Sequence, residues 1–263
     1  MKNHQHITLQ DGARPGTPAV KSTEVAPQLY ARIAGLIYLL VILFGGFSEG
    51  FVMNTLVIPH DMAATARNIV KHPALWDLSL AGNLIIPLIA IIQLWIEYLL
   101  LRPVNRNLAG LFVLLNLASL AVEAVSKVFL ILIKMSLMSA QGGVPADAAL
   151  ALAGFALEAH NVAFNITLVF FGAACLVSGR LIFRSGYFPW FVGLLMQAAG
   201  ASYLIASISE LVLPGLARII SPAILLLALV GESTFCLVLL IRGVDLKMWN
   251  LRTAGAYSAG STV

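Results

Sequence analysis

The sequence predicts an all-α, polytopic integral membrane bundle of six transmembrane helices, with the N- and C-termini in the cytoplasm. Three observations lead to this prediction. Of the 263 residues, 60% are hydrophobic and only 11% are charged, whereas a soluble domain carries about 25% charged residues. Six separate apolar segments are each long enough to cross a bilayer. The basic residues gather in the segments that would lie on one side of the membrane.

The chain opens with a polar segment, residues 1–29, that is rich in Pro, Thr and His and lacks helical periodicity. A segment of this composition buries too little apolar surface to fold, so we expect a disordered cytoplasmic tail. No short apolar region followed by a small-residue cleavage site precedes the first span, so we expect no signal peptide. After a transmembrane domain over residues 30–243, residues 244–263 are expected to form a short cytoplasmic tail.

Each predicted span has about 20 or more mostly apolar residues, the length that crosses roughly 30 Å of hydrocarbon. The third span is the longest, so we expect it to tilt or to project from the bilayer. After the first span, Asp61 predicts the N-cap of a short helix over Met62–Lys71. A small Ala-rich helix is expected just before the fourth span. The six spans cover approximately residues 31–56, 77–101, 108–136, 155–179, 188–213 and 219–241.

The basic residues predict the orientation. With the N-terminus inside, eleven Lys and Arg residues fall in inside segments and three in outside segments, while Lys127 and Lys134 lie in the third span. Cytoplasmic segments of membrane proteins carry an excess of Lys and Arg, so both termini are expected inside. Trp95, Trp190 and Trp249 fall near the proposed inner interface, where aromatic side chains anchor spans.

Several short stretches together resemble a known family. They are Arg32–Tyr38, Asp61–Ile69, Leu101–Arg106, Leu181–Pro189 and the pair Gly231-Glu232. As a set they resemble DUF4386, a bacterial family of multi-span membrane proteins of unknown function, over roughly residues 28–243. The resemblance implies a multi-pass protein of the bacterial cytoplasmic (inner) membrane. It implies no activity and no catalytic residues.

Six of the twelve acidic residues are glutamates inside predicted spans. These six, one in each span, are Glu49, Glu97, Glu123, Glu158, Glu210 and Glu232. An ionisable group at membrane depth costs a few kcal/mol on insertion scales, so such groups usually face the bundle interior. At 100° per residue, other polar side chains fall on the same helix face as most of these glutamates. We therefore expect a bundle with a polar, mainly acidic inner wall.

The polar helix faces that carry these glutamates, here called polar stripes, supply the candidate residues for ligand binding or proton relay. Each candidate also has a structural interpretation: Glu123 and Lys127 have the spacing of a neutralising i, i+4 pair, and Asn side chains also join helices. Outside the candidate set, we expect Glu97 to reach the inner interface and His160 to be an isolated interfacial residue. The candidates are Glu49, Glu123, Lys127, Glu158, Asn161, Asn165, Glu210 and Glu232.

Known catalytic patterns are not found in the sequence. It has no His-Glu-x-x-His motif, no Gly-x-Ser-x-Gly elbow and no glycine-rich phosphate loop. Only one of its five histidines falls in a span, which argues against a zinc hydrolase with three His ligands. Cys175 and Cys236 are expected to be small core residues. We therefore assign no catalytic residue, no metal site and no cofactor.

Three functions remain open. The first is a small carrier, channel or binder whose acidic cavity takes a proton, a cation or a small polar molecule. The second is an accessory or scaffolding protein in which the polar stripes only hold helices together. The third is an intramembrane enzyme on a lipid-like substrate, with paired carboxylates as acid and base. The expected partners are the lipid bilayer and a small-molecule or ion ligand, not nucleic acid, and no feature indicates an oligomeric state.

Overall fold

The computed structural model describes residues 26–260, with the side chains of all of them except residues 141, 214, 216–223 and 255–260. The described residues are almost entirely helical and contain no strand. Six of their helices are long and apolar enough to cross a membrane, which confirms the predicted class of an all-α, multi-pass membrane protein. The tail expected over residues 1–29 falls mostly on residues 1–25, which lie outside this description.

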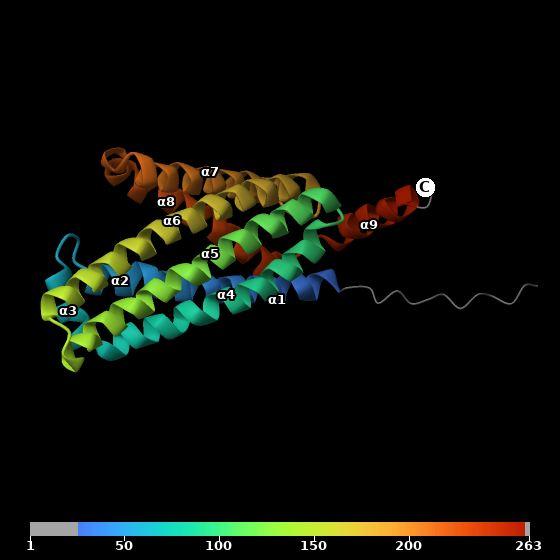
Figure 1. Ribbon diagram of the computed structural model, residues 1–263. Coiled ribbons are helices and arrows are strands. Elements are labelled where there is room, and N and C mark those ends of the chain that lie inside the picture. Colours follow the sequence, from blue (N-terminus) through green and yellow to red (C-terminus); the bar gives the residue numbers. More distant parts are fainter. Residues whose placement is uncertain (1–25, 261–263) are drawn as a thin grey trace, which may run out of the picture.

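The spans are joined by short connections, and two further helices lie outside them (Figure 1). In chain order the elements are α1 (Pro27–Gly45), the π-helix η1 (Gly46–Val52), α2 (Met53–Leu56), α3 (Met62–Lys71), α4 (Pro73–Leu101), α5 (Arg106–Ser139), the 3₁₀ turn η2 (Ala140–Gly142), α6 (Ala146–Ser185), α7 (Trp190–Val212), α8 (Pro214–Leu237), the π-helix η3 (Val238–Arg242) and α9 (Leu246–Gly260).

The first span is one continuous helix, made of α1, η1 and α2, from Pro27 to Leu56. Its middle section is a π-helix, a wider helix that is rare and recurs at functional sites. Glu49 lies in that section. The short helix expected after this span is α3, and the Asp61 side chain accepts a hydrogen bond from the Ala64 amide at 2.8 Å, as an N-cap does.

The longest helix among the described residues is α6, with 40 residues, and not the helix of the third span, α5, which has 34. The expectation that the third span is the longest was therefore wrong. The Ala-rich residues 146–154, expected as a separate short helix, form the first turns of α6 without a break. At 1.5 Å per residue, α6 is about 60 Å long, so it extends well beyond the hydrocarbon layer or crosses it at a steep tilt.

The spans form a closed ring in chain order. α1 packs against α4, α4 against α5, α5 against α6, α6 against α7, and α7 against α8. The ring closes because α8 and η3 pack back against α1. At that closure a Cβ on Gly35 would lie 2.5 Å from the Leu240 amide nitrogen, so only glycine permits the approach. A ring of six helices leaves room for a central cavity.

Small residues also bring α6 and α7 together. A Cβ on Gly193 would lie 2.6 Å from the Gly179 carbonyl oxygen, and one on Gly200 would lie 2.6 Å from that of Gly172. In lipid, helices associate through close packing rather than a hydrophobic driving force, and small residues permit that packing. Two glycine pairs, seven residues or about two helical turns apart, therefore hold α6 and α7 in contact.

The beginning of α1 and the helix α9 lie at the same end of the bundle, here called the terminal end, and α3 lies at the opposite end, the α3 end (Figure 1). At the terminal end, the buried Tyr187 donates a hydrogen bond to the Leu100 carbonyl at 2.6 Å and packs edge-on against Trp249 of α9. Burial raises the pKa of Tyr187 above the ordinary tyrosine value. These contacts attach α9 to the turn between α6 and α7.

Candidate functional site

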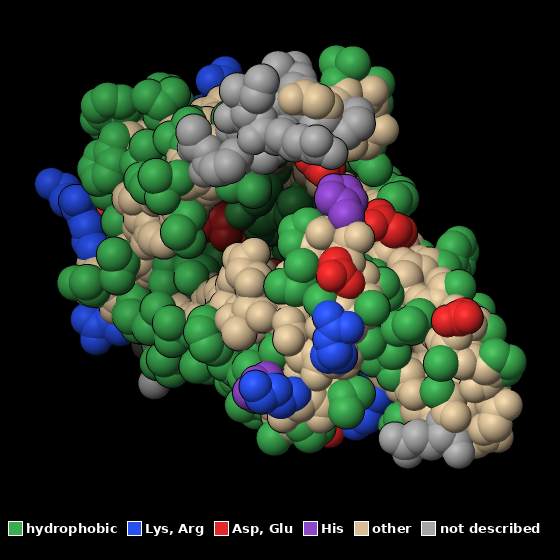
Figure 2. All heavy atoms as spheres, turned by 90° about the vertical axis from the view of Figure 1, so that its left-hand side faces the viewer, with side chains coloured by type: hydrophobic (Ala, Val, Ile, Leu, Met, Phe, Trp, Pro, Cys, Tyr) green, Lys and Arg blue, Asp and Glu red, His purple; other side chains and the backbone are tan. Residues whose placement is uncertain are grey.

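The ring encloses a cavity of about 310 Å³, within the size range of small-molecule sites. Residues of α1, η1, α4, α5, α6, α7 and α8 line it, so every span contributes to the wall. Seen from the α3 end, the molecule is hollowed, and acidic side chains are visible at depth inside (Figure 2). The cavity is therefore accessible from the end opposite the termini.

The wall carries negative charge. Four glutamates line the cavity from four helices: Glu49 of η1, Glu97 of α4, Glu123 of α5 and Glu232 of α8. None of the described lining residues is a lysine, arginine or histidine. A low-dielectric space lined by one sign of charge strongly favours an ion of the other sign. The cavity thus has the electrostatic character of a cation site.

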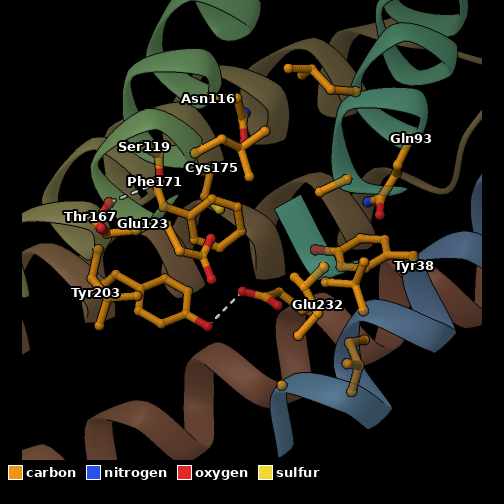
Figure 3. Close-up of a pocket in the computed structure, with 18 of the residues that line it drawn as sticks. Tyr38, Gln93, Asn116, Ser119, Glu123, Thr167, Phe171, Cys175, Tyr203 and Glu232 are labelled. Atoms are coloured by element: carbon orange, nitrogen blue, oxygen red, sulfur yellow. Dashed lines mark hydrogen bonds between the residues drawn. The ribbon is translucent and has the colours of Figure 1, made fainter. Parts of the chain in front are cut away.

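Two of these glutamates have neutral partners only. The Tyr203 hydroxyl donates to Glu232 Oε1 at 2.6 Å (Figure 3), and Gln93 Nε2 donates to Glu97 Oε1 at 2.7 Å. Glu97 is 6% exposed and Glu232 is 8% exposed. Among the described residues, neither carboxyl lies within ion-pair distance of a basic side chain. The negative charge of a Glu97 or Glu232 carboxylate is therefore balanced by a proton or by a bound cation.

Amide oxygens add further acceptors. Asn83 Oδ1 and Gln93 Oε1 are buried and have no hydrogen-bond partner within the described part of the chain. Both residues line the cavity. A buried acceptor without a partner costs about 1–3 kcal/mol, so these oxygens favour water or a ligand that donates hydrogen bonds. The polar part of the wall therefore offers two unpaired acceptor oxygens.

The rest of the wall is apolar and includes aromatic rings. Tyr38 and Phe235 meet edge to face with ring centroids 6.2 Å apart, and Phe171 lies against Tyr203 at 5.4 Å. Phe112 and Phe164 also line the space. Aromatic faces attract ammonium groups, and their area accepts the apolar part of a ligand. The wall therefore suits a molecule with both a positive charge and an apolar body.

The other two glutamates belong to a cluster of ion pairs. Lys127 Nζ of α5 lies 2.6 Å from Glu49 Oε1 and 3.8 Å from Glu123 Oε1. His160 Nε2 of α6 lies 3.6 Å from Glu49 Oε2. The Lys127 ammonium also lies over the Phe164 ring, 4.8 Å from its centroid. We call Glu49, Glu123, Lys127 and His160 the ionic cluster; it joins the first, third and fourth spans at the edge of the cavity.

The structure brings together some of the candidate residues and not others. Glu49, Glu123 and Glu232 line the cavity, and Lys127 is buried beside it. The remaining candidates lie elsewhere. Glu158, Asn161 and Glu210 are exposed, and Asn165 donates back to a carbonyl of its own helix; none of these lines the cavity.

The expected polar face of the fourth span therefore does not form part of the inner wall. The wall uses the face of α6 that carries Phe164, Thr167, Phe171, Cys175 and Ser178, which lies nearly opposite Glu158 on the helix. In the sequence this face looks apolar, so it has the appearance of a packing surface. Helical periodicity shows which residues share a face but not where that face points.

Two residues outside the candidate set lie elsewhere than the sequence predicts. Glu97, expected to reach the inner interface, is buried in the cavity wall. His160, expected to be an isolated interfacial residue, is 1% exposed, faces Glu49 and contacts the Ser126 carbonyl through Nδ1 at 3.1 Å. The signal for His160 was its spacing from Phe164 and Thr167, which places all three on one side of α6.

No group of three or more His, Cys, Asp or Glu side chains within residues 26–260 is arranged to hold a metal ion. Comparison with known proteins adds a family and no activity. The model of the family described as "Domain of unknown function (DUF4386)" matches residues 33–243, most of the chain. No curated protein and no solved structure matches the chain significantly.

Proposed function

Because the chain belongs to the DUF4386 family, whose description names no activity, we propose a function from the cavity: it binds a small organic cation, which the protein carries or senses at the membrane. The observation that carries the proposal is the wall itself, with four glutamates and no basic side chain among its described residues. In this proposal the Glu97 and Glu232 carboxylates hold the positive charge and the aromatic rings hold the apolar part.

The membrane in which the protein lies and its orientation there are part of the same proposal. We place the protein in a bacterial cytoplasmic membrane, and the excess of Lys and Arg at the terminal end favours both termini inside. The α3 end, from which the cavity is accessible, would then face outward. A carrier must open to both sides in turn, so the described shape corresponds to an outward-open state. The lipid bilayer and the cation are the proposed partners.

A melting experiment in detergent tests cation binding. We expect protonated benzylamine to raise the melting temperature of the wild-type protein, and benzyl alcohol, which has nearly the same shape without the charge, to raise it much less. A ligand at 100 times its Kd stabilises the folded state by about 2.7 kcal/mol. Glu97→Gln and Glu232→Gln each remove one carboxylate from the wall. Because a hydrogen bond to a charged group contributes about 1.5–3 kcal/mol, each change should weaken binding tenfold or more.

Glu158→Gln and Glu210→Gln are the matched controls. They make the same chemical change at exposed glutamates outside the cavity, and they should leave the benzylamine shift intact. An equal shift in all four variants would contradict the proposal. If no cation shifts the wild type and the cavity variants melt at the same or a higher temperature, the glutamates act in helix packing, and the scaffolding function is favoured.

A further inference from the structure

The ionic cluster has an imbalance of charge that the cation site does not explain. Glu49 and Glu123 carry two negative charges, and Lys127 supplies one positive charge. With a neutral imidazole on His160, the cluster has a net charge of −1. With a protonated imidazole it is neutral. Since uncompensated charge at membrane depth is costly, the cluster is stabilised by one more positive charge.

The orientation of His160 shows where that charge binds. Nδ1 lies 3.1 Å from the Ser126 carbonyl oxygen, which only accepts hydrogen bonds, so Nδ1 carries a proton in either charge state of the ring. The nitrogen left to carry the second proton of an imidazolium is therefore Nε2, which lies 3.6 Å from Glu49 Oε2. A proton on Nε2 meets a carboxylate, whereas a bare lone pair on Nε2 would face another acceptor.

The cluster is also in contact with the cavity. Glu49 and Glu123 both contribute to the cavity wall, while Lys127 and His160 lie behind them, each 1% exposed. A proton leaving Nε2 can pass by way of the Glu49 carboxylate to the cavity and then to the α3 end. A cation held by Glu97 and Glu232 lies in the same cavity as Glu49 and Glu123. Across a low-dielectric space its positive charge repels the proton on Nε2 and compensates the cluster in its place.

We propose that the ionic cluster is a proton-exchange site and that a proton on His160 and a cation in the cavity are alternatives, so that each cation bound releases one proton. The exchange is balanced: one positive charge enters the cavity, and one proton leaves Nε2 for the cavity water. The proton site stands on the cluster geometry alone. The exchange rests on the proposed cation binding.

Other titratable groups face the same space and must be separated from His160. On the cluster they are Glu49 of η1 and Glu123 and Lys127 of α5. Across the cavity they are Tyr38 of α1, Glu97 of α4, Cys175 of α6, Tyr203 of α7 and Glu232 of α8. The test therefore compares variants that differ only in the cluster, and it counts protons instead of relying on the pH of one transition.

The first measurement examines the proton site without ligand. Nitrogen-15 NMR of histidine-labelled protein, with His160→Gln to assign the signal, reports which ring nitrogen carries the proton. We expect His160 to titrate and its neutral form to keep the proton on Nδ1, whereas a free histidine in water favours Nε2. A neutral ring protonated on Nε2, or a ring that does not titrate, would overturn the proton site.

The second measurement tests the exchange. For wild type, the Kd of benzylammonium should rise as pH falls, approaching tenfold per pH unit for one proton released. In His160→Gln the slope of log Kd against pH, which is negative in wild type, should become shallower by about one unit. Glu49→Gln, which keeps the ring but removes the carboxylate facing it, should give the same loss. The control is His72→Gln, at an exposed histidine outside the spans, which should keep the wild-type slope.

The outcomes separate the two proposals. An unchanged slope in His160→Gln and Glu49→Gln would overturn the exchange and leave cation binding in place. Failure of benzylammonium to bind at any pH would contradict the proposed function and the exchange together. The proton site would then be decided by the NMR measurement by itself.

Discussion

Lys127 shows how a membrane protein keeps a charge at depth. Its side chain is 2% exposed, lies between two carboxylates and rests over an aromatic ring. Taking a lysine out of water costs several kcal/mol, which only good partners offset. In the sequence, the i, i+4 spacing of Glu123 and Lys127 suggested a simple local pair. The structure makes Glu49, 78 residues away, the nearer partner.

Removing the Lys127 ammonium should therefore be severe. We expect Lys127→Met to destabilise the protein by about 3–5 kcal/mol, because two partly buried carboxylates, 22% and 17% exposed, lose their common counter-charge. Lys127→Met combined with Glu49→Gln should recover part of that loss. Lys134→Met is the control: Lys134 pairs with Asp77 where the side chains are 38% and 48% exposed, and such pairs contribute about 0–1 kcal/mol. Unfolding in a denaturing detergent measures all three, and similar losses for the two lysines would refute this view.

At the scale of the helices, the hydrophobic segments were well predicted. The spans expected over residues 31–56 and 77–101 correspond to helices over Pro27–Leu56 and Pro73–Leu101. Every backbone N–H and C=O group in lipid must be hydrogen-bonded within its own helix. Each span is therefore one long helical run of apolar residues, which hydropathy detects. The helix ends were less clear: the fourth span was expected over residues 155–179, whereas α6 covers Ala146–Ser185. Hydropathy locates an apolar segment better than it locates the ends of a helix. The contacts between helices depend on small residues, which hydropathy does not reveal.

The glycine contacts between α6 and α7 lead to a testable prediction about the packing of these helices. We expect Gly193→Val to separate the two helices and to lower the melting temperature by several degrees. An added Cβ would overlap the Phe183 amide nitrogen, which belongs to the backbone of α6. Gly110→Val is the matched control, since a Cβ at Gly110 of α5 meets nothing within 4 Å. Equal losses from both substitutions would contradict this prediction, because Gly110 makes no close helix contact.

For the whole molecule, the ring of spans determines what the glutamates have in common. Four of them reach one cavity because the six helices close on themselves, α8 and η3 against α1. The ring also sets the direction of access, which is the α3 end (Figure 2). The ring does not determine which end of the bundle faces the cytoplasm. The distribution of basic residues predicts that orientation, and it can be tested separately.

Cysteine labelling in intact bacterial cells tests this orientation. Val144→Cys places a thiol in the connection between α5 and α6, and Asn107→Cys places one in the first turn of α5, at opposite ends of that helix. Both positions are exposed, while the native Cys175 and Cys236 are buried. A membrane-impermeant maleimide should label Val144→Cys in intact cells and Asn107→Cys only after permeabilisation. The reverse pattern would place the termini outside.

The membrane class, the number of spans and the presence of a glutamate in each span could be predicted from the sequence. These are properties of single segments: hydropathy, helical spacing and composition do not depend on a neighbour. The tertiary structure decided which glutamates meet. It placed Glu49, Glu97, Glu123 and Glu232 around one cavity and left Glu158 and Glu210 exposed. It also brought His160 to Glu49. The physical reason is that the rotation of each helix about its own axis is set by packing against its neighbours, and no single helix encodes that rotation.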